Sequence, residues 1–252
     1  MMKLIEDERQ HYVANAKALG DSTALVHDFE NVYAALTPCI EIPPSEPQKM
    51  AVVSMIYLLV FCRRQLTIGV LTLMRSYRAD SLLHLRRAIE TCAFAVRICK
   101  HPDLATVWAN GGASDDAYAA YRKAFRPRDV FPPDPDHEQP LSILKERYDL
   151  CSTLMHGGVF GMAGQFETTP ESFRLEFFDL PPDHSLFSVL WQMLDTHKEM
   201  LHFFGRVFDP HTNDQMAAWK VRLNAVEAKL AVHGQRWTPV ILNHTKAFPL
   251  NP

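Results

Sequence analysis

A stretch of about fifty residues without proline constrains the fold of this chain more than any other feature. From Gln48 to Lys100 there is no proline, and Gly69 is the only glycine. Proline and glycine commonly end helices, so the stretch predicts long helices. One helix of that length would be unusual, and polar residues at 76–81 interrupt the apolar period. We therefore predict two helices, at about 46–76 and 80–100.

The rest of the sequence also predicts helices. Apolar residues recur at helical spacing, and segments rich in proline or glycine separate the periodic stretches. Around Thr168–Ser172 the period shortens, which is typical of a hairpin. We therefore expect an all-α fold, a single helical bundle of about seven or eight helices with a small β-hairpin insertion near 159–178.

The length of 252 residues is compatible with a single helical domain over 1–252. Pro239 and Pro249 predict an irregular C-terminal end. The expected parts are N-terminal helices at 1–40, core helices at 46–156, the possible hairpin at 159–178, C-terminal helices at 184–233 and an irregular tail at 237–252.

Composition predicts a cytoplasmic protein. The five cysteines are odd in number and form no Cys-x-x-Cys pair, so a disulfide framework is not expected. The acidic N-terminus does not resemble a signal peptide. Arg63 and Arg64 interrupt the most apolar window, 51–74, which favours a core helix over a membrane span. The net charge of −3 leaves nucleic-acid binding possible but does not support it.

The helix predicted at 80–100 carries a polar group. Glu90 lies within helical reach of Arg86, Arg87 and Arg97. This group is either a polar site on a central helix or an ordinary Arg86–Glu90 ion pair that fixes packing. Residues 63–100 hold eight basic and two acidic residues. Arg86, Arg87 and Arg97 are therefore a candidate anion site, for phosphate or an RNA backbone, unless they only cover apolar surface with their stems.

A second group follows at Tyr148, Ser152 and His156. Steps of four place the three side chains on one helix stripe, where they can form a hydrogen-bond relay. Glu90 is the acid that we pair with His156. Glu90, His156 and Ser152 are thus the catalytic candidates, and Arg86 and Tyr148 complete the predicted polar cluster. The alternative is a histidine at a helix end that bonds only to the backbone.

Metal binding is weakly indicated. Asp195, Glu199 and His202 share one stripe, and Glu199-x-x-His202 is the motif of di-iron bundles. Such bundles need two copies of the motif, and the sequence has one. We therefore predict no metal and no cofactor, and no phosphate-binding loop or dinucleotide motif is present.

The helix predicted at 184–208 is apolar on two sides. Besides its main stripe it carries Phe187, Trp191 and Met200. One bundle face cannot easily cover both sides of a helix, so we expect a homodimer through this helix. The alternative is that the tail from Trp237 folds over the second side.

Two motifs resemble a known family. Arg86-x-x-x-Glu90, followed by His101-Pro102-Asp103, and Tyr148-x-x-x-Ser152-x-x-x-His156 are similar to motifs of a broad family of uncharacterised bacterial all-helical proteins. Members are discussed beside abortive-infection proteins and HEPN nucleases, so the resemblance implies an all-α fold. The Arg-x4–6-His motif of HEPN nucleases occurs twice, about as often as chance gives, and so does not predict a ribonuclease.

These observations predict a helical ligand- or partner-binding protein, with a small-molecule or anionic ligand that the sequence does not identify. The resemblance adds an expected role in bacterial stress or phage defence. The first alternative is a nuclease-like or other hydrolytic enzyme with a Glu90/His156 site. The second alternative is a metal-binding helical bundle.

Overall fold

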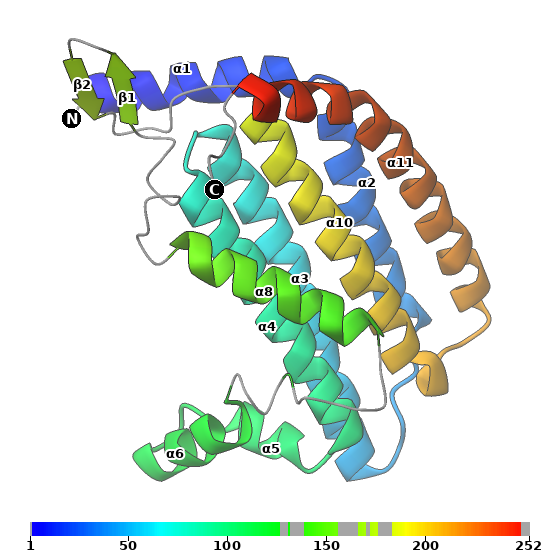
Figure 1. Ribbon diagram of the computed structural model, residues 1–252. Helices are drawn as coiled ribbons and strands as arrows, with labels where there is room; N and C mark the ends of the chain where they lie inside the picture. The colour runs from blue at the N-terminus through cyan, green and yellow to red at the C-terminus, as the bar shows by residue number, and fades with distance from the viewer. Residues whose placement is uncertain are drawn as a thin grey trace.

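The protein is an all-α bundle (Figure 1). The computed structural model describes residues 2–126, 131, 139–155, 166–169, 172–175 and 183–247. Within these ranges there are nine α-helices, where the sequence predicted seven or eight. The helices are α1 (Met2–Leu19), α2 (Ser22–Leu36), α3 (Glu46–Met74), α4 (Arg78–Lys100), α5 (Leu104–Ala109), α6 (Asp115–Ala124), α8 (Gln139–Met155), α10 (Asp183–Val207) and α11 (Gln215–Ala247).

The helix pair α3–α4 is at the centre of the bundle. The helices separate at 75–77, close to the predicted break, and α4 begins at Arg78, two residues earlier than expected. Ser76 has a φ of 65°, in the left-handed region. The buried Asn15 side chain of α1 donates hydrogen bonds to the Met74 carbonyl at 2.9 Å and to the Ser76 hydroxyl at 3.0 Å. This pairing satisfies the last turn of α3 and anchors α1 across the end of the bundle.

Gly69 marks the closest approach of α3 to its neighbours. A side chain at this position would collide with Met193 Cε of α10 and would lie 3.2 Å from His84 Cβ of α4. The single glycine in the proline-free stretch thus serves close packing of three helices, not a helix end.

Helix α10 is covered on both sides by the same chain, which corrects one expectation. Its predicted inner stripe is buried, and Met200 on the other side is also fully buried. Phe187 and Trp191 pack against Trp237 of α11, with ring centroids 5.7 and 6.1 Å apart. The second apolar side therefore needs no second copy of the chain, and the reasoning that predicted a homodimer through α10 does not hold.

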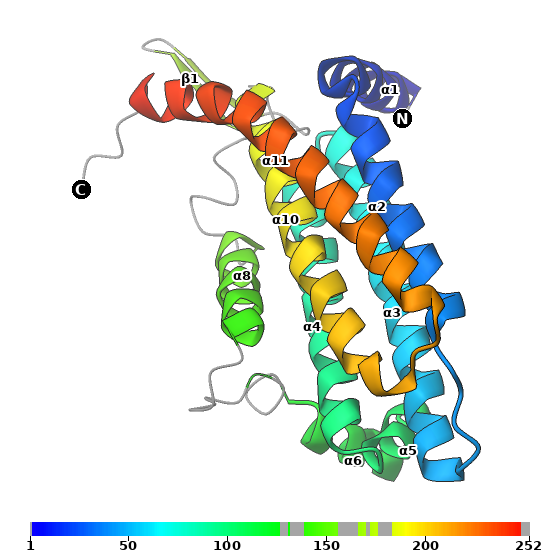
Figure 2. The same cartoon turned by 90° about the vertical axis from the view of Figure 1, so that its right-hand side faces the viewer.

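The predicted irregular tail is wrong up to residue 247. Helix α11 continues through Pro239 to Ala247 and bends toward its C-terminal end (Figures 1 and 2). Proline removes one backbone donor from a helix, but packing can outweigh that loss. Trp237 is buried here, and Gly234 leaves room for the Trp191 ring, which any side chain at 234 would meet.

Helix α3 meets the length and composition of a membrane span, but half of its most apolar window is buried inside the bundle. It packs against α4, α2, α5 and α10. Its inner face is therefore part of the core, as predicted.

Two short strands lie between α8 and α10. Strand β1 (Phe166–Thr169) pairs antiparallel with β2 (Ser172–Leu175), with Phe166 opposite Leu175 and Thr169 opposite Ser172. The remaining residues of the predicted insertion, 159–165, 170–171 and 176–178, lie outside the described residues.

A buried tyrosine–histidine pair lies in the core. The Tyr33 hydroxyl of α2 and Nδ1 of His197 of α10 share a hydrogen bond of 2.8 Å. His197 is fully buried, and burial lowers its pKa from 6.5 to about 3. It is therefore neutral in the folded protein at physiological pH.

Removing Trp237 should test whether α11 holds the second side of α10. We expect Trp237→Ala to lower the free energy of unfolding by about 3–5 kcal/mol, because it leaves a cavity beside Trp191. The control is Val232→Ala on the exposed side of α11, which should change the free energy of unfolding by less than about 0.5 kcal/mol. Urea unfolding measures both, and equal small effects would contradict the packing.

The neutral His197 should make stability depend on pH. In the unfolded chain His197 takes up a proton near pH 6.5, but in the folded protein it does so only near pH 3. The contribution of His197 to stability is thus complete above pH 6.5 and falls by about 1.4 kcal/mol per pH unit below it. Unfolding of His197→Gln and wild type from pH 7 to 4 should show a flatter dependence for the variant. Parallel curves would contradict this assignment.

Candidate functional site

One face of α4 presents the polar residues predicted from the sequence. Arg86, Glu90, Phe94 and Arg97 fall on successive turns of the same side of the helix. Helix α8 packs against α4, and in Figure 2 it lies on the opposite side of α4 from α3. The inner side of α4 is apolar and buried in the core. Its second side carries the polar residues and faces α8.

Tyr148 of α8 completes a three-residue network with Arg86 and Glu90. Arg86 Nη2 donates to the Tyr148 hydroxyl at 2.7 Å, and this hydroxyl donates to Glu90 Oε1 at 2.8 Å. Arg86 Nη2 also lies 3.7 Å from Glu90 Oε1. The Arg86 guanidinium lies 4.7 Å from the centre of the Tyr148 ring. Each member thus contacts both others, and the Nε of Arg86 is the one buried atom of the three side chains without a hydrogen-bond partner in the described residues.

Electrostatics keep the network in one protonation state. Burial is the main cause that raises the pKa of Tyr148, and its hydrogen bond to Glu90 adds to it. The hydrogen bond that Arg86 donates to Tyr148 is the main cause that raises the pKa of Arg86, and electrostatic interactions with Tyr148 and then Glu90 add to it. The phenol therefore stays protonated, accepting from Arg86 and donating to Glu90.

Ser152 and His156 do not extend this network within the described residues. The Ser152 hydroxyl donates to the Tyr148 carbonyl of its own helix at 2.8 Å, so it bonds to backbone and not to the phenol. Serine often bonds to the carbonyl one turn earlier, which the stripe argument did not consider. His156 lies outside the described residues, so its pairing with Glu90 stays a prediction.

The three arginines of the predicted anion site are not together. Arg87 is exposed, one residue beyond Arg86 and therefore turned about 100° away from it. Arg86 and Arg97 are half-buried on the face that α8 covers. Arg87 thus lies apart from the other two on α4, and anion binding by these three residues stays a prediction.

The candidate metal ligands are bonded to other groups. Asp195 lies 3.0 Å from Arg147 and 2.7 Å from Lys198, and Glu199 lies 3.0 Å from Lys198. His202 contacts Glu227 of α11. Among the described residues no group of three or more acidic, histidine or cysteine side chains could hold a metal ion.

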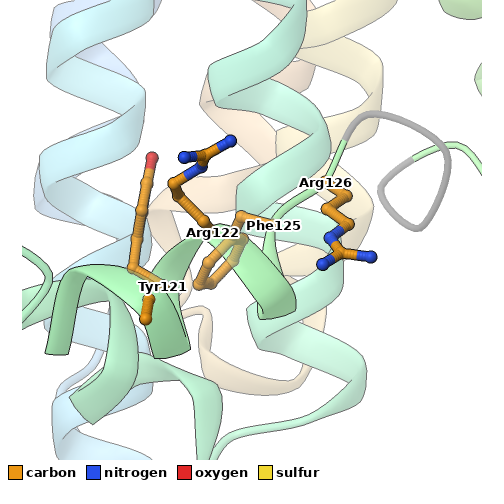
Figure 3. Close-up of a pocket in the computed structure, with 5 residues that line it drawn as sticks. Tyr121, Arg122, Phe125 and Arg126 are labelled. Atoms are coloured by element: carbon orange, nitrogen blue, oxygen red, sulfur yellow. The ribbon is translucent and has the colours of Figure 1, made fainter. Parts of the chain in front are cut away.

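A cavity beside the network was not found from the sequence. It has a volume of about 470 Å³ and is lined by Ala119, Tyr121, Arg122, Phe125 and Arg126. Figure 3 shows the Tyr121 hydroxyl and the Arg122 guanidinium pointing the same way from α6, with Phe125 between Arg122 and Arg126. One feature of the sequence could have indicated the cavity. Two aromatic residues, Tyr121 and Phe125, and two arginines, Arg122 and Arg126, each stand four residues apart and therefore share a helix side.

The cavity and the network adjoin. Burial and then the charge of Glu90 raise the pKa of Tyr121, so Glu90 is near the cavity wall. Phe94, one turn after Glu90, packs on Phe125 with ring centroids 5.0 Å apart. Phe131 packs on Tyr148 at 5.3 Å. We refer to the cavity and the Arg86–Tyr148–Glu90 network together as the α4 groove.

Comparison with known proteins adds no assignment. The chain matches no family model, no curated protein and no solved structure. The family resemblance of the two motifs therefore remains a hypothesis.

A double-mutant cycle should measure the network. We expect Tyr148→Phe to cost about 1–2 kcal/mol, because it removes hydrogen bonds to two charged groups. Combined with Glu90→Gln, the effects should be non-additive by about 1 kcal/mol. Tyr118→Phe, at an exposed tyrosine of α6, is the control and should be neutral. Chemical unfolding measures each variant, and additive effects would show that the two residues are not coupled.

Proposed function

We propose that this chain is a helical ligand-binding protein whose α4 groove takes a small anionic ligand with a planar ring. The observation that carries this proposal is the pair of exposed guanidiniums, Arg122 and Arg126, at a cavity floored by aromatic rings. Arginine binds phosphate and carboxylate groups through paired donors and also stacks on rings.

The charge of the groove supports an anion. Arg122 and Arg126 line the cavity, and no acidic residue lines it among the described residues. Glu90, the acid of the adjoining α4 face, already accepts from Tyr148 and lies beside Arg86. The cavity thus carries net positive charge, and its volume is in the range of small-molecule sites, about 300–1,000 Å³.

The same contacts favour binding over hydrolysis. A general base needs a carboxylate that can reach the proton of a substrate or water. In this structure Glu90 Oε1 already accepts a hydrogen bond from the Tyr148 hydroxyl. We therefore keep hydrolysis through Glu90 and His156 as the alternative outcome of the test, and a role in bacterial stress or phage defence as an expectation from the resemblance.

Calorimetry with three probes tests the proposal. Phenyl phosphate combines ring and anion, inorganic phosphate has only the charge, and phenol has only the ring. We expect phenyl phosphate to bind most tightly. Arg122→Gln with Arg126→Gln should weaken it at least about tenfold, equivalent to ~1.4 kcal/mol. Arg87→Gln, an exposed arginine of α4 outside the groove, is the matched control and should leave affinity unchanged.

Two results would contradict ligand binding in the groove. One is that no probe binds at millimolar concentration, and the other is equal binding by wild type and the double variant. Release of 4-nitrophenol from 4-nitrophenyl phosphate, lost in Glu90→Gln, would favour the hydrolytic alternative instead.

A further inference from the structure

The outer face of α3 is apolar and exposed. Tyr57 is 65% exposed, Val60 51%, Met50 41%, Leu71 40% and Phe61 39%. Isolated exposed apolar residues are ordinary, but a continuous row along one helix usually marks an interaction surface. The outer face consists of Met50, Val53, Tyr57, Val60, Phe61, Arg64, Ile68 and Leu71.

These eight positions are symmetric along the helix. The spacings between them, read from either end, are three, four, three, one, three, four and three residues. The midpoint lies between Val60 and Phe61. A two-fold axis through this midpoint would therefore superpose the row on itself with the helix direction reversed.

We infer that a second copy of this chain docks on the outer face of α3, as an antiparallel α3–α3 pair about an axis between Val60 and Phe61. This arrangement places Met50 against Leu71 and Val53 against Ile68 of the partner. Two-fold pairing is the commonest symmetry of homodimers, and it requires a surface that is complementary to itself.

Charge complementarity supports a second copy as the occupant. Arg64 carries the only charge in the outer face of α3. In the antiparallel pair it lies opposite Tyr57, the most exposed aromatic ring of the row. A guanidinium over a tyrosine ring is a favourable cation–π contact. The two Arg64 residues would be roughly 10 Å apart along the axis, about a Debye length.

The size of the face is compatible with a dimer. The row spans 22 positions, or roughly 33 Å at 1.5 Å per residue. Its five most exposed side chains present roughly 400 Å² if an aromatic side chain offers about 200 Å² when free. A standard interface buries about 800 Å² per partner. The half-buried Val53, Ile56 and Ile68 and the stem of Arg64 extend the contact toward that area.

A lipid surface is the competing occupant, and Arg64 argues against it. An arginine in the middle of an apolar face would lie at the depth of the lipid chains, where burying a charge is costly. In the dimer the same charge meets an aromatic ring. The protein partner is therefore the occupant that the residues favour.

Sedimentation and light scattering of the full chain test the dimer. We expect a dimer at micromolar concentration, and Val60→Glu should weaken its association at least about tenfold because it places two like charges beside the axis. Val232→Glu, at an equally exposed valine of α11, is the matched control and should remain dimeric. Circular dichroism and thermal melting should show that both variants are folded, since both sites are on the surface.

Crosslinking tests the geometry. In a Cys99→Ser background, which removes the exposed thiol, Val60→Cys should form a disulfide with its own copy. Met50→Cys should not, because the two copies lie roughly 30 Å apart, but it should crosslink when mixed with Leu71→Cys. A monomer at 100 μM, or a dimer that Val60→Glu does not weaken, would overturn the inference. So would binding of wild type, but not Val60→Glu, to vesicles of phosphatidylcholine and phosphatidylserine.

Discussion

The close packing of α3 on α4 is the constraint on which the other helices depend. Gly69 leaves room on α3 for the Met193 side chain of α10 and for His84 of α4, and Asn15 closes the turn that joins α3 to α4. Because the core is close-packed, this approach fixes where α10 lies and hence where α11 must cover it. One side of α4 packs against α8, and α3 has an exposed apolar side of its own.

The polar network on α4 has a structural role, because it holds α8 against α4. Tyr148 joins α8 to Arg86 and Glu90, so α8 is held by directional hydrogen bonds in addition to apolar contact. Such a network fixes the position and rotation of a helix more strictly than apolar packing does. The cavity at Tyr121 and Phe125 lies beside this rigid wall, and its arginines are exposed where a ligand can reach them.

The two proposals concern different helices and depend on different interactions. Anion binding depends on guanidinium charge beside aromatic rings in the α4 groove. Self-association depends on exposed apolar area arranged symmetrically along α3. Neither uses a residue of the other, so the failure of one leaves the other standing. Together they describe a dimer with two separate ligand sites facing away from the interface.

The sequence by itself determined the helices and much of the polar network. Helical period and the positions of proline and glycine located the helices and the α3–α4 break, and four-residue spacing placed Arg86 and Glu90 on one helix stripe and Tyr148 and Ser152 on another. These are local properties of the backbone. Only the tertiary structure decided that α11 continues past Pro239, because Trp237 packs on Phe187 and Trp191 of α10. It also placed the cavity residues beside α4, because Phe94 packs on Tyr121 and Phe125, and no local pattern predicts a contact between residues so distant in sequence.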